Sequence, residues 1–314
     1  MQENNLRSGA VAAIGACILW GILPLYWKSL TGVTAYEILA HRVCWSFLFV
    51  ILLLAASQRI GFFLQQTRHL LQNRRNSLLL LGASILISIN WLTYIWAVNS
   101  GRIVETSIGY YTNPLMSVLL GVVVFHEHLS RGKMLSLILA GIGIANMIWN
   151  FGQVPWVAVI LATTFAVYGA VKKTLHMDPM VSILLETLLV MPLALAYIFY
   201  LTAVGQSNFL TALPTAALLI GSGIVTAVPL LLFSRGANLL PLNVLGFTQY
   251  LAPTIALCLG VFVFDEAFGM VQLVSFSFIW LALLVFSLSG RFAMLPRSKA
   301  AVEKKIAQQE QIIN

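Results

Sequence analysis

The chain has 314 residues, of which 60% are hydrophobic and only 9% are charged, and its net charge is +8. Soluble domains carry roughly 25% charged residues, so this composition argues against a soluble fold and predicts a polytopic membrane protein. The basic residues fall between the apolar segments and in the C-terminal tail, which argues against the basic face of a nucleic-acid-binding protein.

Ten apolar segments are long enough to cross a bilayer as helices of about 19 residues. We therefore expect an all-α fold with ten transmembrane helices. The first segment is expected to be retained, because no small-residue cleavage pattern of a signal peptide follows it. The predicted spans are about 10–28, 35–57, 77–98, 105–125, 132–150, 155–172, 181–203, 215–235, 244–264 and 269–290.

The positions of Lys and Arg predict the orientation of these spans. With ten spans, both termini lie on one side, and that side carries fifteen Lys and Arg residues against two on the other, Lys28 and Arg102. Because cytoplasmic loops carry the excess of Lys and Arg, both termini are predicted to be cytoplasmic. Residues 58–76 form the longest internal loop, and both an amphipathic helix on the cytoplasmic leaflet and a partly ordered basic loop fit its pattern.

The segment 110–127 recurs 139 positions later, with eight matches among the seventeen positions from 111 to 127. Such self-similarity indicates an internal repeat. Five spans per half is an odd number, so equivalent helices run in opposite directions. We predict two inverted five-helix repeats, residues 1–150 and 151–291, followed by a cytoplasmic tail at 292–314. The matches include Tyr111 and Tyr250, Pro114 and Pro253, Gly121 and Gly260, and Glu127 and Glu266.

Pro114 and Pro253 are predicted to act as helix breakers inside their spans. In a helix, each proline leaves the carbonyl four residues earlier, of Tyr110 or Gln249, without its donor. Unpaired backbone at membrane depth is tolerated only where protein or a watery cavity covers it. Inverted repeats with interrupted spans at matching positions are typical of secondary transporters. The sequence therefore predicts a cavity where the two copies meet.

Polar side chains inside the spans are candidates to line this cavity. Arg42 is expected about 10 Å deep, where a charge costs several kcal/mol unless it is paired or hydrated. Snorkelling toward a helix end is the alternative. The uncharged polar residues suit a neutral or zwitterionic organic solute, although each one singly also fits packing between helices. The substrate-cavity candidates are Arg42, Asn90, Tyr94, Tyr110, Asn113, Gln249 and Tyr250.

His41 and Glu186 are the candidates for proton coupling, if transport is coupled to protons. For both, a hydrogen-bonded structural role is the alternative. Arg42 and Glu186 differ in expected depth by roughly 12 Å, so no direct ion pair between them is predicted. Glu127 and Glu266 are expected at span ends, as helix-end or gating elements. The Gly-Ser-Gly run at 221–223 has no triad partner, and we interpret it as a close-packing patch.

At these segments the chain resembles the RarD-type permeases of the EamA family, in the drug/metabolite transporter superfamily. The resemblance implies ten helices in two EamA repeats, a central cavity, residence in the bacterial inner membrane and the family label of chloramphenicol-sensitivity protein. Small multidrug relatives use a glutamate in the first span, and this chain has no acidic residue there, so their proton coupling does not carry over. The matching segments are 38–46 (ILAHRVCWS), 90–99 (NWLTYIWAVN), 109–114 (GYYTNP), 185–187 (LET) and 246–253 (GFTQYLAP).

The sequence thus predicts a secondary transporter that moves a small organic metabolite or drug-like solute by alternating access, in the direction of export. Its expected partners are the solute, the lipid bilayer and, if coupled, protons. No cofactor or metal is expected, because the three cysteines lack paired spacing and no nucleotide-binding motif occurs. The alternative is a non-transporting membrane scaffold or an intramembrane enzyme. A polar central cavity open to one side favours the transporter.

Overall fold

The computed structural model describes residues 2–30, 32–100, 102–263 and 269–294. Within these ranges the secondary structure is helical and contains no strand. Glu266 and the predicted tail from residue 295 onward lie outside the described residues. The helices are α1 (Gln2–Lys28), α2 (Ala35–Ala56), α3 (Ile60–Gln72), α4 (Arg74–Asn99), α5 (Ile103–Val123), α6 (Arg131–Phe151), α7 (Trp156–Leu175), α8 (Pro179–Ala203), α9 (Leu213–Leu239), α10 (Leu242–Gln249), α11 (Leu251–Val263) and α12 (Met270–Met294).

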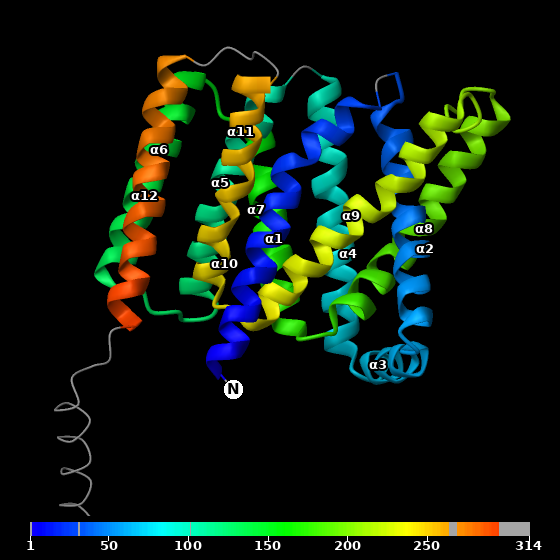
Figure 1. The fold of residues 1–314 in the computed structure, drawn as a ribbon, viewed down its shortest axis with the longest axis horizontal. Coiled ribbons are helices and arrows are strands. Elements are labelled where there is room, and N and C mark those ends of the chain that lie inside the picture. The colour runs from blue at the N-terminus through cyan, green and yellow to red at the C-terminus, as the bar shows by residue number, and fades with distance from the viewer. Residues whose placement is uncertain (1, 31, 101, 264–268, 295–314) are drawn as a thin grey trace, which may run out of the picture.

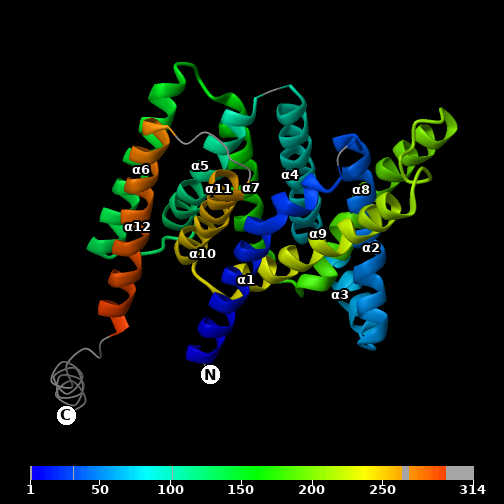
Figure 2. The same ribbon diagram turned by 45° about the horizontal axis from the view of Figure 1, so that its top comes forward.

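The long helices cross the bundle in alternating directions, and the start of α1 and the end of α12 lie at the same end of it (Figures 1 and 2). We call this end the terminal face. The opposite end, where residues 29–30, 32–34 and 204–212 lie, is the distal face. The all-helical, polytopic fold class predicted from the sequence is confirmed.

Nine of the described segments are long and apolar enough to cross a membrane, with α10 and α11 counted together as Leu242–Val263. The segment expected at 105–125 forms α5 but is not among the nine, because Glu105 and the polar run at 110–113 lower the hydropathy of its first half. Within the bundle, α5 packs against α7 and α10. The tenth crossing therefore stays a prediction.

The two repeated prolines have different effects on their helices. Near Pro253 the chain is interrupted, since α10 ends at Gln249 and α11 begins at Leu251. Pro253 is then the third residue of α11, where a backbone N–H has no partner within the helix anyway. By contrast, α5 runs from Ile103 to Val123 through Pro114, so the predicted break there is not seen. Proline has a φ compatible with helix, and packing against α7 and α10 holds α5 continuous.

Small residues allow α2 and α9 to approach closely. A Cβ atom at Gly223 would lie 2.3 Å from the backbone carbonyl carbon of Trp45. The Ser46 hydroxyl also donates a hydrogen bond to the Gly223 carbonyl at 3.0 Å, and Ser222 is buried. Small residues at helix crossings are the usual way for membrane helices to gain van der Waals contact. The interpretation of 221–223 as a close-packing patch is confirmed.

The loop 58–76 contains a helix, which decides between its two sequence interpretations. Helix α3 lies at the terminal face and packs against α2, α4 and α8 (Figure 1). Leu70 is buried, whereas Leu64 and Leu71 are exposed beside basic residues. This pattern is typical of an amphipathic helix at a membrane surface.

We expect Gly223→Ala to destabilise the protein by about 1–3 kcal/mol, because the added methyl group forces α2 and α9 apart. The matched control is Gly141→Ala in α6, where nothing lies within 4 Å of the added Cβ atom. The control should keep or slightly raise the melting temperature of the purified protein in detergent. Equal melting temperatures for the two variants would contradict the proposed close packing.

Candidate functional site

A cavity of about 220 Å³ lies inside the bundle and is partly open to solvent. Because Trp27 in the last turn of α1 and Gly109 near the start of α5 line it, the cavity lies toward the distal face. Eight helices contribute to its wall. The lining residues are Trp20, Leu23, Pro24 and Trp27 of α1; Arg42 of α2; Asn90, Trp91 and Tyr94 of α4; Gly109, Tyr110 and Asn113 of α5; Leu161 and Phe165 of α7; Thr226 and Leu230 of α9; Gln249 of α10; and Ala252, Pro253 and Ala256 of α11.

Arg42 places a guanidinium group in this cavity. Its Nε donates a hydrogen bond to the Thr226 hydroxyl at 2.9 Å. Its Cζ lies 4.7 Å from the centre of the Trp27 ring and 5.2 Å from that of Trp91, at distances typical of cation–π contact. None of the ion pairs between described residues involves Arg42. The charge is therefore held by aromatic rings and one hydroxyl group, without a carboxylate.

The two repeated segments meet at one side of the cavity through amide groups. The Asn113 side-chain nitrogen donates to Gln249 Oε1 at 2.9 Å, and the Gln249 nitrogen lies 3.4 Å from the Ser117 hydroxyl. Asn113 is only 9% exposed, and its Oδ1 has no hydrogen-bond partner among the described residues. A buried oxygen without a partner costs about 1–3 kcal/mol, so a hydrogen bond from a bound solute would stabilise this acceptor.

Asn90 and the tyrosines complete the polar wall. Asn90 donates to the Leu161 carbonyl and to the Thr164 hydroxyl, both at 2.9 Å, and so also holds α4 against α7. The rings of Tyr94 and Tyr110 lie 5.6 Å apart. Tyr110, which also lines the cavity, is 44% exposed.

Aromatic side chains close the cavity toward the terminal face. Trp20 and Phe165 line the cavity and also pack on Phe233, with ring centres 5.4 and 5.3 Å apart. Phe233 in turn stacks on Tyr168 at 6.4 Å, and both of these rings are fully buried. We call Trp20, Phe165, Phe233 and Tyr168 the aromatic floor. The cavity therefore has solvent access on one side and a packed wall on the other.

Tyr250, Pro114 and His41 lie outside the cavity lining. Tyr250 is buried in an apolar cluster with Phe247, because the turn between α10 and α11 directs its side chain away from the cavity. The Pro114 carbonyl oxygen would lie 3.0 Å from a Cβ atom at Gly246, so Pro114 is covered by α10. His41 accepts a hydrogen bond from Trp45 at 3.2 Å and stacks on Phe209 at 4.9 Å.

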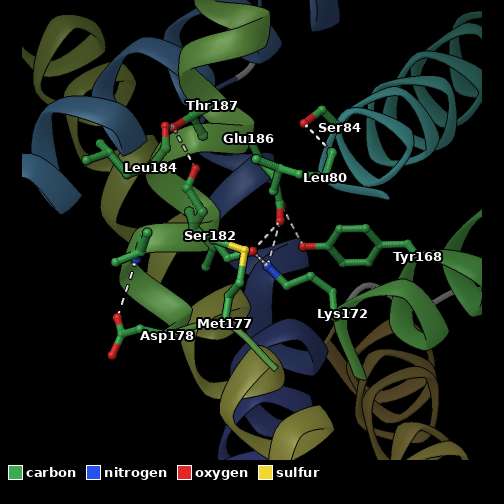
Figure 3. A network of polar contacts seen from close by, with 12 residues as sticks. Leu80, Ser84, Tyr168, Lys172, Met177, Asp178, Ser182, Leu184, Glu186 and Thr187 are labelled. Atoms are coloured by element: carbon green, nitrogen blue, oxygen red, sulfur yellow. Dashed lines mark hydrogen bonds and ion pairs between the residues drawn. The ribbon is translucent and has the colours of Figure 1, made fainter. Parts of the chain in front are cut away.

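Glu186 lies in a buried polar network between α7 and α8 (Figure 3). Its carboxylate is 2.7 Å from the Lys172 ammonium and accepts hydrogen bonds from the hydroxyls of Ser182 at 2.8 Å and Tyr168 at 2.9 Å. The expectation that Glu186 does not pair with Arg42 agrees with this geometry. Sequence reasoning missed the role of Lys172, since it puts this residue at the end of the predicted span 155–172 and counts it among the basic residues of the terminal side. The helix continues to Leu175, and the apolar Val171 and Leu175 were the available signal.

Glu127 joins three elements at the terminal face. Its carboxylate accepts hydrogen bonds from the backbone N–H groups of Leu242 at 2.5 Å and Asn243 at 2.7 Å, at the start of α10. The Lys173 ammonium of α7 lies 3.2 Å away and also donates to the Leu240 carbonyl at 2.7 Å. A carboxylate at a helix N-terminus is stabilised by the helix dipole. This position fits the predicted helix-end element.

Comparison with known proteins adds family evidence. Residues 7–149 match the EamA-like transporter family. The chain is 42% identical over 291 residues to "Uncharacterized transporter YojE" of Bacillus subtilis, which covers 92% of this chain and 96% of that protein. It is 37% identical over 300 residues to "Protein RarD" of Escherichia coli, and the alignment covers 95% of this chain and 100% of that protein. A solved chain described as "Crystal structure of protein" has the same fold, with a TM-score of 0.70, 15% identity, and 92% and 99% covered.

We expect Glu186→Gln to destabilise the protein by about 3–5 kcal/mol, because it leaves the Lys172 charge buried without its partner. The double variant Lys172→Met with Glu186→Leu removes both charges and should recover most of this loss. Thermal unfolding of the purified variants in detergent tests both statements. A single variant as stable as the wild type would show that the pair contributes little.

Proposed function

The chain belongs to the EamA-like transporter family, with RarD-type relatives along nearly its whole length, and we propose that it is a secondary transporter moving a small organic solute by alternating access. The observation that carries the proposal is the cavity with polar groups in an aromatic wall, partly open on one side and closed by the aromatic floor on the other. A scaffold would have its centre packed with apolar side chains. The bacterial relatives named as transporters and the membrane-spanning helices also place the chain among multi-pass membrane proteins of bacteria.

The packing of the helices supports two repeats, residues 1–150 and 151–291. If α1, α2, α4, α5 and α6 correspond to α7, α8, α9, α10–α11 and α12, exchanging the halves preserves the most extensive helix pairings. The contact of α1 with α9 matches that of α7 with α4, and the contact of α5 with α7 matches that of α10–α11 with α1. The contacts α2–α8, α5–α10 and α6–α12 each map onto themselves. Each helix of the first half and its equivalent in the second half run in opposite directions, as inverted repeats require.

The excess of Lys and Arg supports a cytoplasmic terminal face in the inner membrane. The cavity then lies in the periplasmic half, and the structure corresponds to an outward-facing conformation. The aromatic floor and the Glu127 contacts to α10 and Lys173 form the cytoplasmic closure. Solute passage requires these contacts to separate.

The two copies of the repeat differ in one hydrogen bond. The Tyr111 hydroxyl donates to the Pro253 carbonyl at 2.9 Å. The corresponding Tyr250 hydroxyl is buried and has no partner among the described residues, and its counterpart acceptor is the Pro114 carbonyl. In an inverted-repeat transporter the halves exchange conformations between states. We therefore assign the bond from Tyr250 to the Pro114 carbonyl to the inward-facing state.

Export is the direction that the resemblance to RarD-type permeases implies. His41 and Glu186 are the groups that we propose for proton coupling. His41 Nε2 is buried without a hydrogen-bond partner in the described structure. Glu186 exchanges a proton only in a state in which Lys172 moves away from it.

Reconstituted protein should transport a small organic solute across proteoliposome membranes, and a pH gradient should change the rate if protons are coupled. Arg42→Ala and Gln249→Ala should lower the rate at least tenfold, because both side chains line the cavity. Gly141→Ala, far from the cavity, is the control. If neither cavity variant lost transport, the assignment of these residues to the solute site would be wrong. Transport in both directions without saturation would indicate a channel.

Tyr111→Phe and Tyr250→Phe should shift the conformational equilibrium in opposite directions. One buried hydrogen bond contributes about 1 kcal/mol, which corresponds to about a fivefold shift. The reporter is Ala256→Cys in a variant without Cys17, Cys44 and Cys258, labelled from outside by a membrane-impermeant maleimide. We expect Tyr111→Phe to slow labelling and Tyr250→Phe to keep or accelerate it. A shift in the same direction for both variants would contradict alternating access through this pair.

A further inference from the structure

The chemistry of the cavity wall indicates the class of solute, if the proposed transport function holds. Arg42 is the charged residue of the described lining, and it has no carboxylate partner in the described structure. The Arg42 Nε donates to the Thr226 hydroxyl, while the two terminal nitrogens of Arg42 donate to no described residue. A planar carboxylate accepts two parallel hydrogen bonds from such a guanidinium group, and a charge at membrane depth gains most from such a partner.

Aromatic rings continue the wall from the guanidinium group. Trp27 and Trp91 both lie within cation–π distance of Arg42, and Trp20 and Phe165 belong to the aromatic floor. Rings of this kind bury a large apolar area and stack on other rings. The solute therefore has an apolar, preferably aromatic, body attached close to its carboxylate. The volume of about 220 Å³ limits it to a small molecule.

Asn113 supplies the third element of recognition. Its Oδ1 is a buried acceptor without a partner, and its side-chain nitrogen is already bound to Gln249. Because an amide oxygen can only accept, a solute that binds Oδ1 must bring the donor. A hydroxyl and an amino group both satisfy this requirement.

We propose that the cavity recognises a small organic carboxylate with an aromatic or bulky apolar body and a hydrogen-bond donor. The carboxylate binds Arg42, the body lies against the tryptophans, and the donor binds Asn113. Of the neutral or zwitterionic solutes expected from the sequence, this assignment keeps the zwitterions, and it adds anions that carry a carboxylate.

Binding to the purified protein, measured by isothermal titration calorimetry in detergent, tests the proposal without requiring transport. The series is 3-phenylpropionate, 3-phenyllactate, phenylalanine, phenylalaninamide and 2-phenylethylamine, which differ by one functional group at a time. We expect phenyllactate or phenylalanine to bind most tightly. Compounds without a carboxylate should bind at least tenfold more weakly. An amide or amine that binds as tightly as its carboxylate, or no binding by any carboxylate, overturns the proposal.

Variants assign each preference to its residue. Arg42→Gln should abolish the preference for carboxylate over amide, and Arg42→Lys should reduce it, because lysine keeps the charge without the two-pronged geometry. Asn113→Leu should remove the advantage of phenyllactate and phenylalanine over phenylpropionate but keep the carboxylate preference. If Arg42→Gln does not fold, Arg42→Lys decides, and an unchanged preference in it overturns the proposal.

Transport of the same series into proteoliposomes separates the two hypotheses. Binding with the expected preference but without transport contradicts the proposed function and leaves the recognition intact. Transport of compounds without a carboxylate, at rates equal to their carboxylate counterparts, contradicts the recognition and leaves the transport function intact.

Discussion

The structure depends on one constraint, that polar groups inside an apolar bilayer must find their partners within the protein. The contact between α5 and the α10–α11 break meets this constraint where the two repeated segments cross. Asn113 binds Gln249, and Tyr111 binds the carbonyl of Pro253. Gly246 lies against the Pro114 carbonyl, so the backbones approach closely. This contact covers the backbone at the break between α10 and α11, and the cavity lies beside it.

Charged groups follow the same constraint in two different ways. Glu186 and Lys172 form a pair, as do Glu127 and Lys173, and each carboxylate also accepts further hydrogen bonds. These four residues lie on the terminal side of the cavity and fix α7 to its neighbours. Arg42 instead faces the cavity with aromatic rings around it and no carboxylate in the described structure. A charge left unpaired in an otherwise satisfied interior is where a ligand gains most.

The two halves are alike in helix pairing but unlike in local conformation. One repeated helix is continuous and its counterpart is interrupted, and Tyr111 has a partner that Tyr250 lacks. An inverted repeat with identical halves would open equally to both sides. In the proposed inverted-repeat transporter, this difference between the copies provides the asymmetry for facing one side at a time.

Hydrophobicity and the spacing of repeated residues can be read along the chain, so the sequence alone determined nine of the ten predicted spans in the described residues and the spacing of the two copies. It also identified six of the seven candidates that line the cavity. Only the tertiary structure decided that Tyr250 turns away, that Lys172 pairs with Glu186 and that His41 stacks on Phe209. These outcomes depend on how each helix rotates about its axis and on partners as distant as the 168 positions between His41 and Phe209. No periodicity within a single helix encodes that rotation, because packing against the other helices sets it.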